Sequence, residues 1–150
     1  MTNRLFCYGT LQIPEVMKAV TGQTYHGVNA RLPGYAIYRV KDAEYPGVID
    51  APDHETSGVL YRGLSDEDLA VLDLFEGELY ERRLLEVNSE DGKSYHAWVY
   101  VICPKNRAYL TRETWHLKTF MKKDFDTFMK YYVNDRKEIY AKKIDLLKIL

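Results

Sequence analysis

LDLFEG occupies residues 72–77 of this 150-residue chain and leads directly into ELYERR, residues 78–83. Upstream, Ser65 lies three residues before the carboxylate of Asp68, and at this spacing the two side chains can cap the first turn of a helix. The apolar residues that follow keep helical spacing: Leu69, Leu72 and Phe75. Gly77 offers the left-handed backbone conformation that commonly ends a helix. The sequence therefore predicts a helix that begins near Ser65 and ends at residue 76.

Glu76 is then the last side chain of this helix, where it faces the negative end of the helix dipole and several unpaired carbonyls. This position disfavours the ionised carboxylate. Its neighbours can also shield it from water and raise its pKa toward the range of a proton carrier: Phe75, Leu79 and Tyr80. Glu76 is therefore the candidate general acid/base. The alternative is a solvated helix-end residue in an acidic surface run, and Glu78 is a second candidate base because helix ends shift by a few residues.

The length and the cysteine content of the chain predict a single intracellular domain. A mass of 17.6 kDa suits one hydrophobic core, and we expect a domain over residues 1–132 with residues 133–150 as its C-terminal helical extension. Cys7 and Cys103 each lie in an apolar stretch, which predicts buried reduced thiols. No leader or membrane-length apolar run is present, and the four histidines lack metal-ligand spacing. We expect a cytoplasmic protein with no metal and no membrane contact.

Charge is distributed unevenly along the chain. Residues 105–150 hold 12 lysines or arginines and 6 aspartates or glutamates, a net charge of +6, whereas residues 1–104 carry −7. Acidic and apolar residues interrupt the lysines at helical spacing, which favours a solvated helix face over a nucleic-acid-binding or membrane-binding arm. The 13 tyrosines are a weak indication of a polar cavity, because tyrosine suits half-wet pockets.

The N-terminal segment predicts a buried strand followed by a loop. RLFCY, residues 4–8, is nearly all apolar or aromatic, Gly9 and Thr10 interrupt it, and Pro14 suits the first turn of a short helix. Such a loop presents backbone N–H groups next to a helix N-terminus and can hold a small anion such as a carboxylate. On these residues alone, a turn that binds nothing is the ordinary interpretation.

Further strands are predicted over residues 25–30, 35–40 and 57–64. A Pro33-Gly34 turn separates the first two strands, and residues 50–55 form a polar loop. Tyr45 precedes Pro46, which places the pair at an edge, a bulge or the start of a strand. The Tyr45 ring then either faces a pocket or covers the edge of the core.

A hairpin is predicted from residues 80–87 and 95–103, joined at Asp91-Gly92. Alternation places Tyr100 on one face of the second strand, from which its hydroxyl can reach a cavity.

After Thr111 the spacing of the apolar residues changes to that of a helix. One stripe of this helical region is expected to pack on the domain's own core: Leu117, Met121, Phe125, Phe128 and Tyr132. Asn134 and Asp135 break the pattern, and the lysine-rich residues 136–150 can pack, fray or form an interface.

The order of the motifs is more specific than any single motif. FCYGTL at residues 6–11 precedes YP at 45–46, GVLY at 58–61, LDLFEG at 72–77, YER at 80–82 and AWVYV at 97–101. Over most of residues 4–132 this order resembles the γ-glutamylcyclotransferase-like superfamily. Its AIG2-like branch is the most similar, because the segment around Trp115 resembles that branch's tryptophan-containing helix.

The resemblance implies an α+β fold, a small mixed β-barrel with flanking helices, a polar cavity and a helical C-terminal extension. It implies that Glu76 is the acid/base and that the loop of Tyr8, Gly9, Thr10 and Leu11 holds a glutamyl head group. The implied reaction cyclises a small γ-glutamyl substrate to 5-oxoproline, releases an amine or amino acid, and needs no cofactor. We add three tyrosines as candidate substrate-binding residues: Tyr45, Tyr80 and Tyr100.

Two alternatives stay open. Many plant-type members share the motifs without an assigned activity, so the fold can also serve as a catalytically silent module that binds a small ligand or a protein. Nucleic-acid binding by the basic tail ranks below both. Cys7 stands where members often carry valine, and a buried thiol there is compatible with the same packing.

Overall fold

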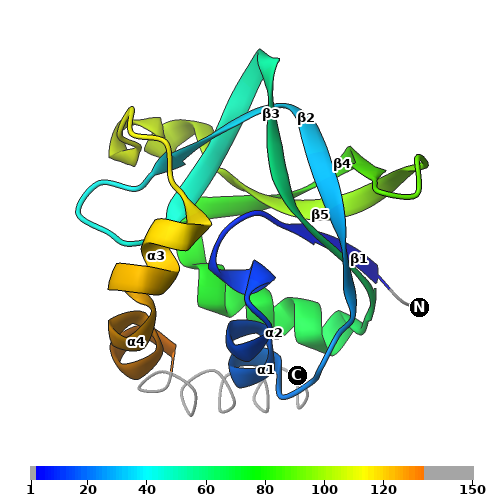
Figure 1. Ribbon diagram of the computed structural model, residues 1–150, viewed down its shortest axis with the longest axis horizontal. Helices are drawn as coiled ribbons and strands as arrows, with labels where there is room; N and C mark the ends of the chain where they lie inside the picture. Colours follow the sequence, from blue (N-terminus) through cyan, green and yellow to red (C-terminus); the bar gives the residue numbers. More distant parts are fainter. Residues whose placement is uncertain (1–2, 134–150) are drawn as a thin grey trace.

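A computed structural model describes residues 3–133 of the chain, apart from the Tyr132 side chain, and shows five strands closed into a barrel with helices packed on it (Figure 1). The strands follow one another around the barrel in the order β1-β3-β2-β4-β5. Their bounds are Asn3–Cys7 for β1, Gly27–Arg39 for β2, Pro46–Leu64 for β3, Tyr80–Ser89 for β4 and Ser94–Ile102 for β5. Neighbours are antiparallel, except that β1 closes on β5 in parallel with Leu5 opposite Trp98. The mixed barrel and the α+β class are as predicted.

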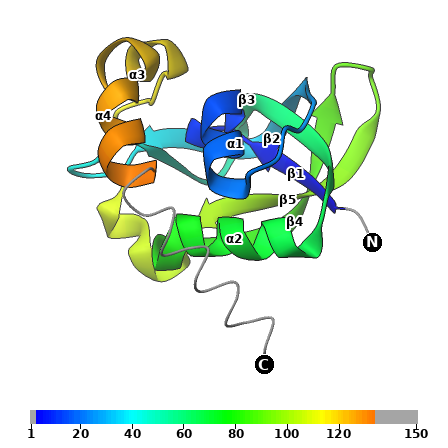
Figure 2. The ribbon, with the colours of Figure 1, turned by 90° about the horizontal axis from the view of Figure 1, so that it is seen from below.

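The helices connect the strands and cover part of the barrel. The longer ones are α1, Pro14–Thr21; α2, Asp66–Glu76; α3, Leu117–Lys123; and α4, Phe125–Phe128. Short helical turns complete the set: η1, Thr10–Gln12; η2, Gly77–Leu79; η3, Pro104–Tyr109; and η4, Met129–Val133. Helix α1 contacts both α2 and η4, and Figure 2 shows these helices together on one side of the barrel.

Helix α2 has the N-terminal cap, the buried face and the C-terminal glycine that its sequence predicts. The Asp68 N–H donates to Ser65 Oγ at 3.1 Å, which caps the first turn. Leu69, Leu72 and Phe75 are buried. Gly77 ends the helix with a φ of 75°, a conformation that glycine adopts without strain. Its ψ of −164° lies outside the left-handed helical region that we expected. The predicted span from Ser65 to Glu76 is confirmed.

Two apolar cores follow from strand alternation. In β1, Phe6 packs in the inner cluster that fills the barrel, whereas Leu5 and Cys7 pack in an outer cluster between the barrel and the helices. The same alternation in β5 places Val99 inside and Tyr100 outside. The outer cluster also holds the buried side chains of α2, so the last turn of α2 lies directly against β1 and β5.

The region predicted as two strands and a turn is one long strand, β2. Gly34 has a φ of 81° and marks a shift in the register between β2 and β3. Pro33 lies opposite Glu55 but Tyr35 lies opposite Asp50, so the extra residues of β3 bulge outward at this point. Proline and glycine therefore bend the strand here and do not reverse it. The predicted loop over residues 50–55 lies within β3.

The prediction of an apolar packing stripe in the C-terminal helical region is partly wrong. Phe120, Phe128 and Val133 are the buried residues of α3, α4 and η4, whereas Met121 is 43% exposed. A break at Asp124 separates α3 from α4 and rotates the buried face. Cys7 is buried as predicted, but Cys103 is only half-buried. Residues 134–150, and with them most of the predicted extension, lie outside the described residues. No helix within residues 3–133 is long and apolar enough to cross a membrane.

Candidate active site

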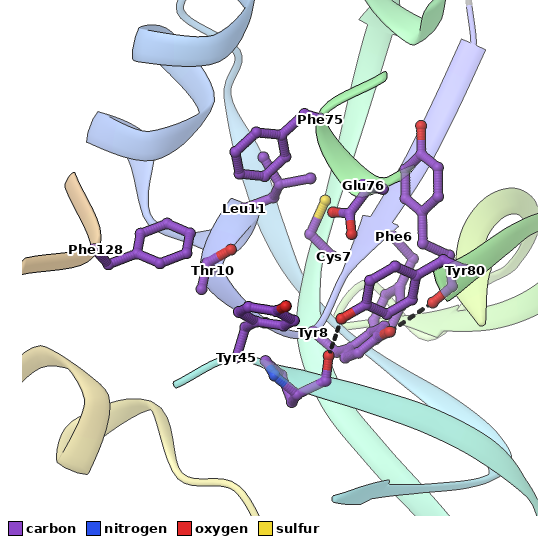
Figure 3. A pocket seen from close by; sticks show the side chains of 13 residues that line it. Phe6, Cys7, Tyr8, Thr10, Leu11, Tyr45, Phe75, Glu76, Tyr80 and Phe128 are labelled. Carbon is purple, nitrogen blue, oxygen red and sulfur yellow. Dashed lines mark hydrogen bonds between the residues drawn. The ribbon is translucent and has the colours of Figure 1, made fainter. Parts of the chain in front are cut away.

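A small pocket lies where β1, the loop that follows it, the starts of β3 and β4, β5, α4 and the end of α2 meet (Figure 3). All eight site residues named from the sequence line it: Tyr8, Gly9, Thr10, Leu11, Tyr45, Glu76, Tyr80 and Tyr100. The other lining residues are Phe6, Cys7, Pro46, Phe75 and Phe128. The structure thus brings the candidates together from five separate segments, and their chemical roles stay predictions.

Glu76 presents the pocket's carboxyl group. As Figure 3 shows, this carboxyl lies beside the Cys7 thiol. Burial, and then the negative charge of Asp73 one helical turn earlier, together raise the pKa of Glu76 to about 8. A carboxyl with this pKa can both accept and return a proton near neutral pH.

Asp73 belongs to a polar network behind the pocket. Its carboxylate accepts hydrogen bonds from the Tyr100 hydroxyl at 2.7 Å and from Arg82 Nε at 2.9 Å. The Arg82 guanidinium lies 4.3 Å from the centre of the Trp98 ring, an arrangement that favours a cation–π contact. Burial, and then Asp73, raise the pKa of Tyr100. This network keeps the Tyr100 phenol protonated and fixes it at the pocket wall.

The loop after β1 exposes unpaired backbone donors. Within residues 3–133, the backbone N–H groups of Gly9, Thr10 and Leu11 donate to no acceptor, as is usual for a first helical turn. Gln12 Nε2 donates to the Tyr8 carbonyl at 2.7 Å, and the Tyr61 hydroxyl donates to the Leu11 carbonyl at 3.0 Å. These bonds hold the loop in one shape around its three amides.

Gly9 is needed at its position because of close packing. A Cβ atom there would lie 2.8 Å from Cγ of Pro46, well inside van der Waals contact. Pro46 is itself the first residue of β3 and cannot move as a flexible side chain could. Any side chain at residue 9 would therefore displace the loop or the start of β3.

The tyrosines join the walls of the pocket through their hydroxyls. Tyr8 donates to the Tyr100 carbonyl at 2.5 Å, and Tyr80 donates to the Pro46 carbonyl at 2.6 Å, both drawn in Figure 3. Burial, followed by the charge of Glu76, raises the pKa of Tyr8, so its hydroxyl stays a donor. Tyr45 is half-buried and its ring lines the pocket, which is one of the two positions considered for it.

Glu78, the second candidate base, is exposed and does not line the pocket. Its backbone carbonyl instead accepts a hydrogen bond from Asn106 Nδ2 at 3.1 Å. Among the described residues no group of three histidine, cysteine, aspartate or glutamate side chains is placed to hold a metal ion.

Sequence reasoning missed several residues of the site. The motifs contain Asp73 and Arg82 without indicating a role for either, although Asp73 stands three residues before Glu76 and thus shares its helix face. Phe128 belongs to the predicted packing stripe, yet it also lines the pocket. Its ring meets Phe75 edge-on, with the ring centres 6.4 Å apart.

Comparisons with known proteins agree with this fold. AIG2-like protein C of Arabidopsis thaliana is 31% identical over 142 residues, which span 92% of this chain and 82% of that protein. AIG2-like protein B of the same plant is 29% identical over 79% of this chain and 74% of its own length. The solution structure of another Arabidopsis thaliana protein matches 95% of this chain and 85% of its own, with a TM-score of 0.69 and 26% identity.

A structure named gamma-glutamyl cyclotransferase shares the fold with a TM-score of 0.62, over 69% of this chain and 68% of its own, at 17% identity. The family model described as "Gamma-glutamyl cyclotransferase, AIG2-like" matches residues 5–117, which contain every pocket residue except Phe128. The chain therefore belongs to the AIG2-like family of gamma-glutamyl cyclotransferases.

Proposed function

We propose that the protein cyclises a γ-glutamyl compound to 5-oxoproline and releases an amine or amino acid. One observation carries the proposal: Glu76, with its pKa raised to about 8, shares a small pocket with the three unpaired amides of residues 9–11. Membership of the family supports a cyclotransferase-like role.

Substrate binding places the two reacting ends of the glutamyl head together. The α-carboxylate of the substrate accepts hydrogen bonds from amides of Gly9, Thr10 and Leu11, because unpaired N–H groups at a helical turn suit a small anion. The α-ammonium group then lies toward Glu76, the carboxyl of the pocket. With its α-carbon held through both of these groups, the head folds so that its nitrogen meets its own γ-carbonyl carbon, and binding meets much of the entropic cost of ring closure.

Ring closure moves two protons, one after the other, from the α-nitrogen to the leaving nitrogen. Glu76 first accepts a proton from the α-ammonium group, and the free amine attacks the γ-carbonyl carbon to form the new C–N bond. Glu76 then donates a proton to the leaving nitrogen as its bond to that carbon breaks, and accepts the surplus proton of the ring nitrogen. That proton finally passes to the released amine. No electrons are exchanged with any other group, so the reaction balances without a co-reactant.

The raised pKa of Glu76 suits these transfers. With a pKa of about 8 in place of the ordinary 4.5, Glu76 is a much stronger base toward the substrate's α-ammonium group. A catalytic pKa near the operating pH favours both acceptance and return of a proton, which is the condition for an efficient acid/base catalyst. Amides of the loop that the α-carboxylate leaves unused can stabilise the oxyanion of the tetrahedral intermediate.

The test is 5-oxoproline release from γ-glutamyl amines, γ-glutamyl amino acids and glutathione, with wild type and Glu76→Gln side by side. Release by wild type and its loss in the folded variant are expected. Equal release by Glu76→Gln would overturn the role of Glu76. Saturable binding of these compounds by wild type, with no product from any of them, would instead favour the catalytically silent binding module.

A further inference from the structure

We propose that Phe128, with Phe75 and Tyr45, forms the subsite for the leaving amine and selects apolar or aromatic amines. This inference rests on the proposed function and deepens it by naming a substrate class. It is carried by the position of Phe128, which reaches the pocket from α4, beyond the matched residues 5–117.

The Phe75 and Phe128 rings form an apolar wall of the pocket, and Tyr45 also lines the pocket. Phe128 is 2% exposed, and its ring meets Phe75 edge-on at 6.4 Å between centres. Phe120 supports it from behind, edge-on at 5.3 Å, and Trp115 packs against Phe120 at 5.7 Å. Phe120 and Trp115 do not line the pocket. Phe128 is therefore held rigidly in place by residues that have no access to the substrate.

The reaction geometry directs the leaving group toward this wall. In Figure 3, Phe128 lies across the pocket from Glu76, beyond Thr10. The glutamyl head must span the loop amides and Glu76, because its α-carboxylate and α-amino group use them. The substituent on the leaving nitrogen projects away from the head, so the remaining walls receive it. Tyr45, Phe75 and Phe128 belong to those walls, and the other lining residues, apart from Glu76 and the loop of residues 8–11, are Phe6, Cys7, Pro46, Tyr80 and Tyr100.

Charge reinforces the selection. Of the described residues that line the pocket, none is lysine, arginine or histidine, and Glu76 supplies the single carboxyl group. A leaving group that carries a carboxylate would bring it against aromatic rings and near Glu76, with no cation among these residues to offset its desolvation. An apolar amine gains contact area on the same rings.

The experiment compares kcat/KM for three substrates: γ-glutamyl phenethylamide, γ-glutamyl ethylamide and γ-glutamylglycine. Wild type should turn over the phenethylamide at least about tenfold better than the ethylamide, since filling an apolar pocket is worth roughly 10–200-fold. The ethylamide should in turn exceed γ-glutamylglycine. Phe128→Leu should reduce the preference for the phenethylamide over the ethylamide severalfold. Intrinsic reactivity cancels, because each variant is compared on the same pair of amides.

Phe120→Leu is the matched control. It alters the same aromatic stack and tests for general loosening, but its side chain does not line the pocket, so the substrate preference should persist. Equal kcat/KM for the phenethylamide and the ethylamide in wild type, or an unchanged preference in folded Phe128→Leu, would overturn the subsite while leaving the cyclotransferase intact. Absence of 5-oxoproline from every substrate would instead refute the proposed function.

Discussion

Tyr100 donates its hydroxyl to the carboxylate of Asp73 at 2.7 Å, although the two residues lie 27 positions apart in the chain. This bond connects a wall of the pocket to the helix that carries Glu76. Arg82 completes the arrangement by donating to the same carboxylate oxygen at 2.9 Å. Asp73 therefore sets the electrostatic environment of Glu76 from outside the pocket, and Arg82 offsets part of its charge.

Asp73→Asn should lower the pKa of Glu76, because it removes a nearby negative charge that disfavours the carboxylate. The acid limb of kcat/KM against pH should move to lower pH. Arg82→Gln should move it the other way, since Asp73 then loses its cation. Burial raises the pKa values of Cys7, Tyr8 and Tyr100, so these neighbours stay neutral and cannot supply the limb. Acid limbs that coincide in both variants would contradict this coupling.

The dependence of wild-type kcat/KM on pH follows from the pKa of Glu76. Attack requires that one proton leave the pair formed by Glu76 and the substrate ammonium group. With a pKa of about 8 for Glu76, kcat/KM should fall about tenfold for each pH unit below 8. Initial rates of 5-oxoproline release between pH 5.5 and 9.5 measure this. An acid limb near pH 4.5, the value of an ordinary glutamate, would show that the carboxyl is not buried in solution.

The pH dependence of the unfolding free energy should reveal the raised pKa of Glu76 independently of any activity. The folded-state pKa of Glu76, about 8, lies above its ordinary value of 4.5, so between these values the folded state binds the extra proton. The contribution is therefore fully present below pH 4.5 and is lost as the pH rises through about 8. Relative to Glu76→Gln, the wild type should lose up to about 1.4 kcal/mol of unfolding free energy per pH unit in this window. Urea denaturation of both proteins at several pH values measures the difference, which a constant offset would refute.

Tyr61→Phe should loosen the substrate loop, because it removes the hydrogen bond to the Leu11 carbonyl. We expect a loss of about 1 kcal/mol of unfolding free energy together with a severalfold higher KM. Tyr25→Phe is the control: it removes the hydroxyl bonded to Asp68, which does not line the pocket. It should cost similar stability with KM unchanged. A KM that rises equally in both variants would show that the effect is general destabilisation.

The parts of the site that depend on local structure could be predicted from the sequence. Ser65, the apolar spacing of α2 and Gly77 place Glu76 at a helix end whatever the rest of the chain does, and strand alternation brings Tyr100 to the outer face of β5. The positions of Glu76 and Tyr100 in their elements could therefore be predicted directly from the sequence. The clustering of all eight residues required the order of motifs, because no local rule brings the loop after β1 to the end of α2.

Long-range packing accounts for what the sequence did not reveal. Pro33-Gly34 has the composition of a reversing turn, but pairing with β3 continues on both sides of the pair, and the extra residues lie in β3 opposite it. Phe128 was recognisable as apolar, yet only the docking of α4 shows that its ring faces a pocket. Asp73 and Arg82 come from a helix and a strand whose contact no spacing encodes.

The central claim is that Glu76 carries the proton in ring closure, and 5-oxoproline release at pH 8 by Glu76→Gln and Glu78→Gln tests it most directly. Glu78 is exposed and outside the pocket, so its variant controls for the loss of one carboxylate at the same helix end. On the best substrate of the panel, kcat should fall at least about a hundredfold in Glu76→Gln and stay within about twofold of wild type in Glu78→Gln. Comparable kcat values for both variants, with both proteins folded, would contradict the account.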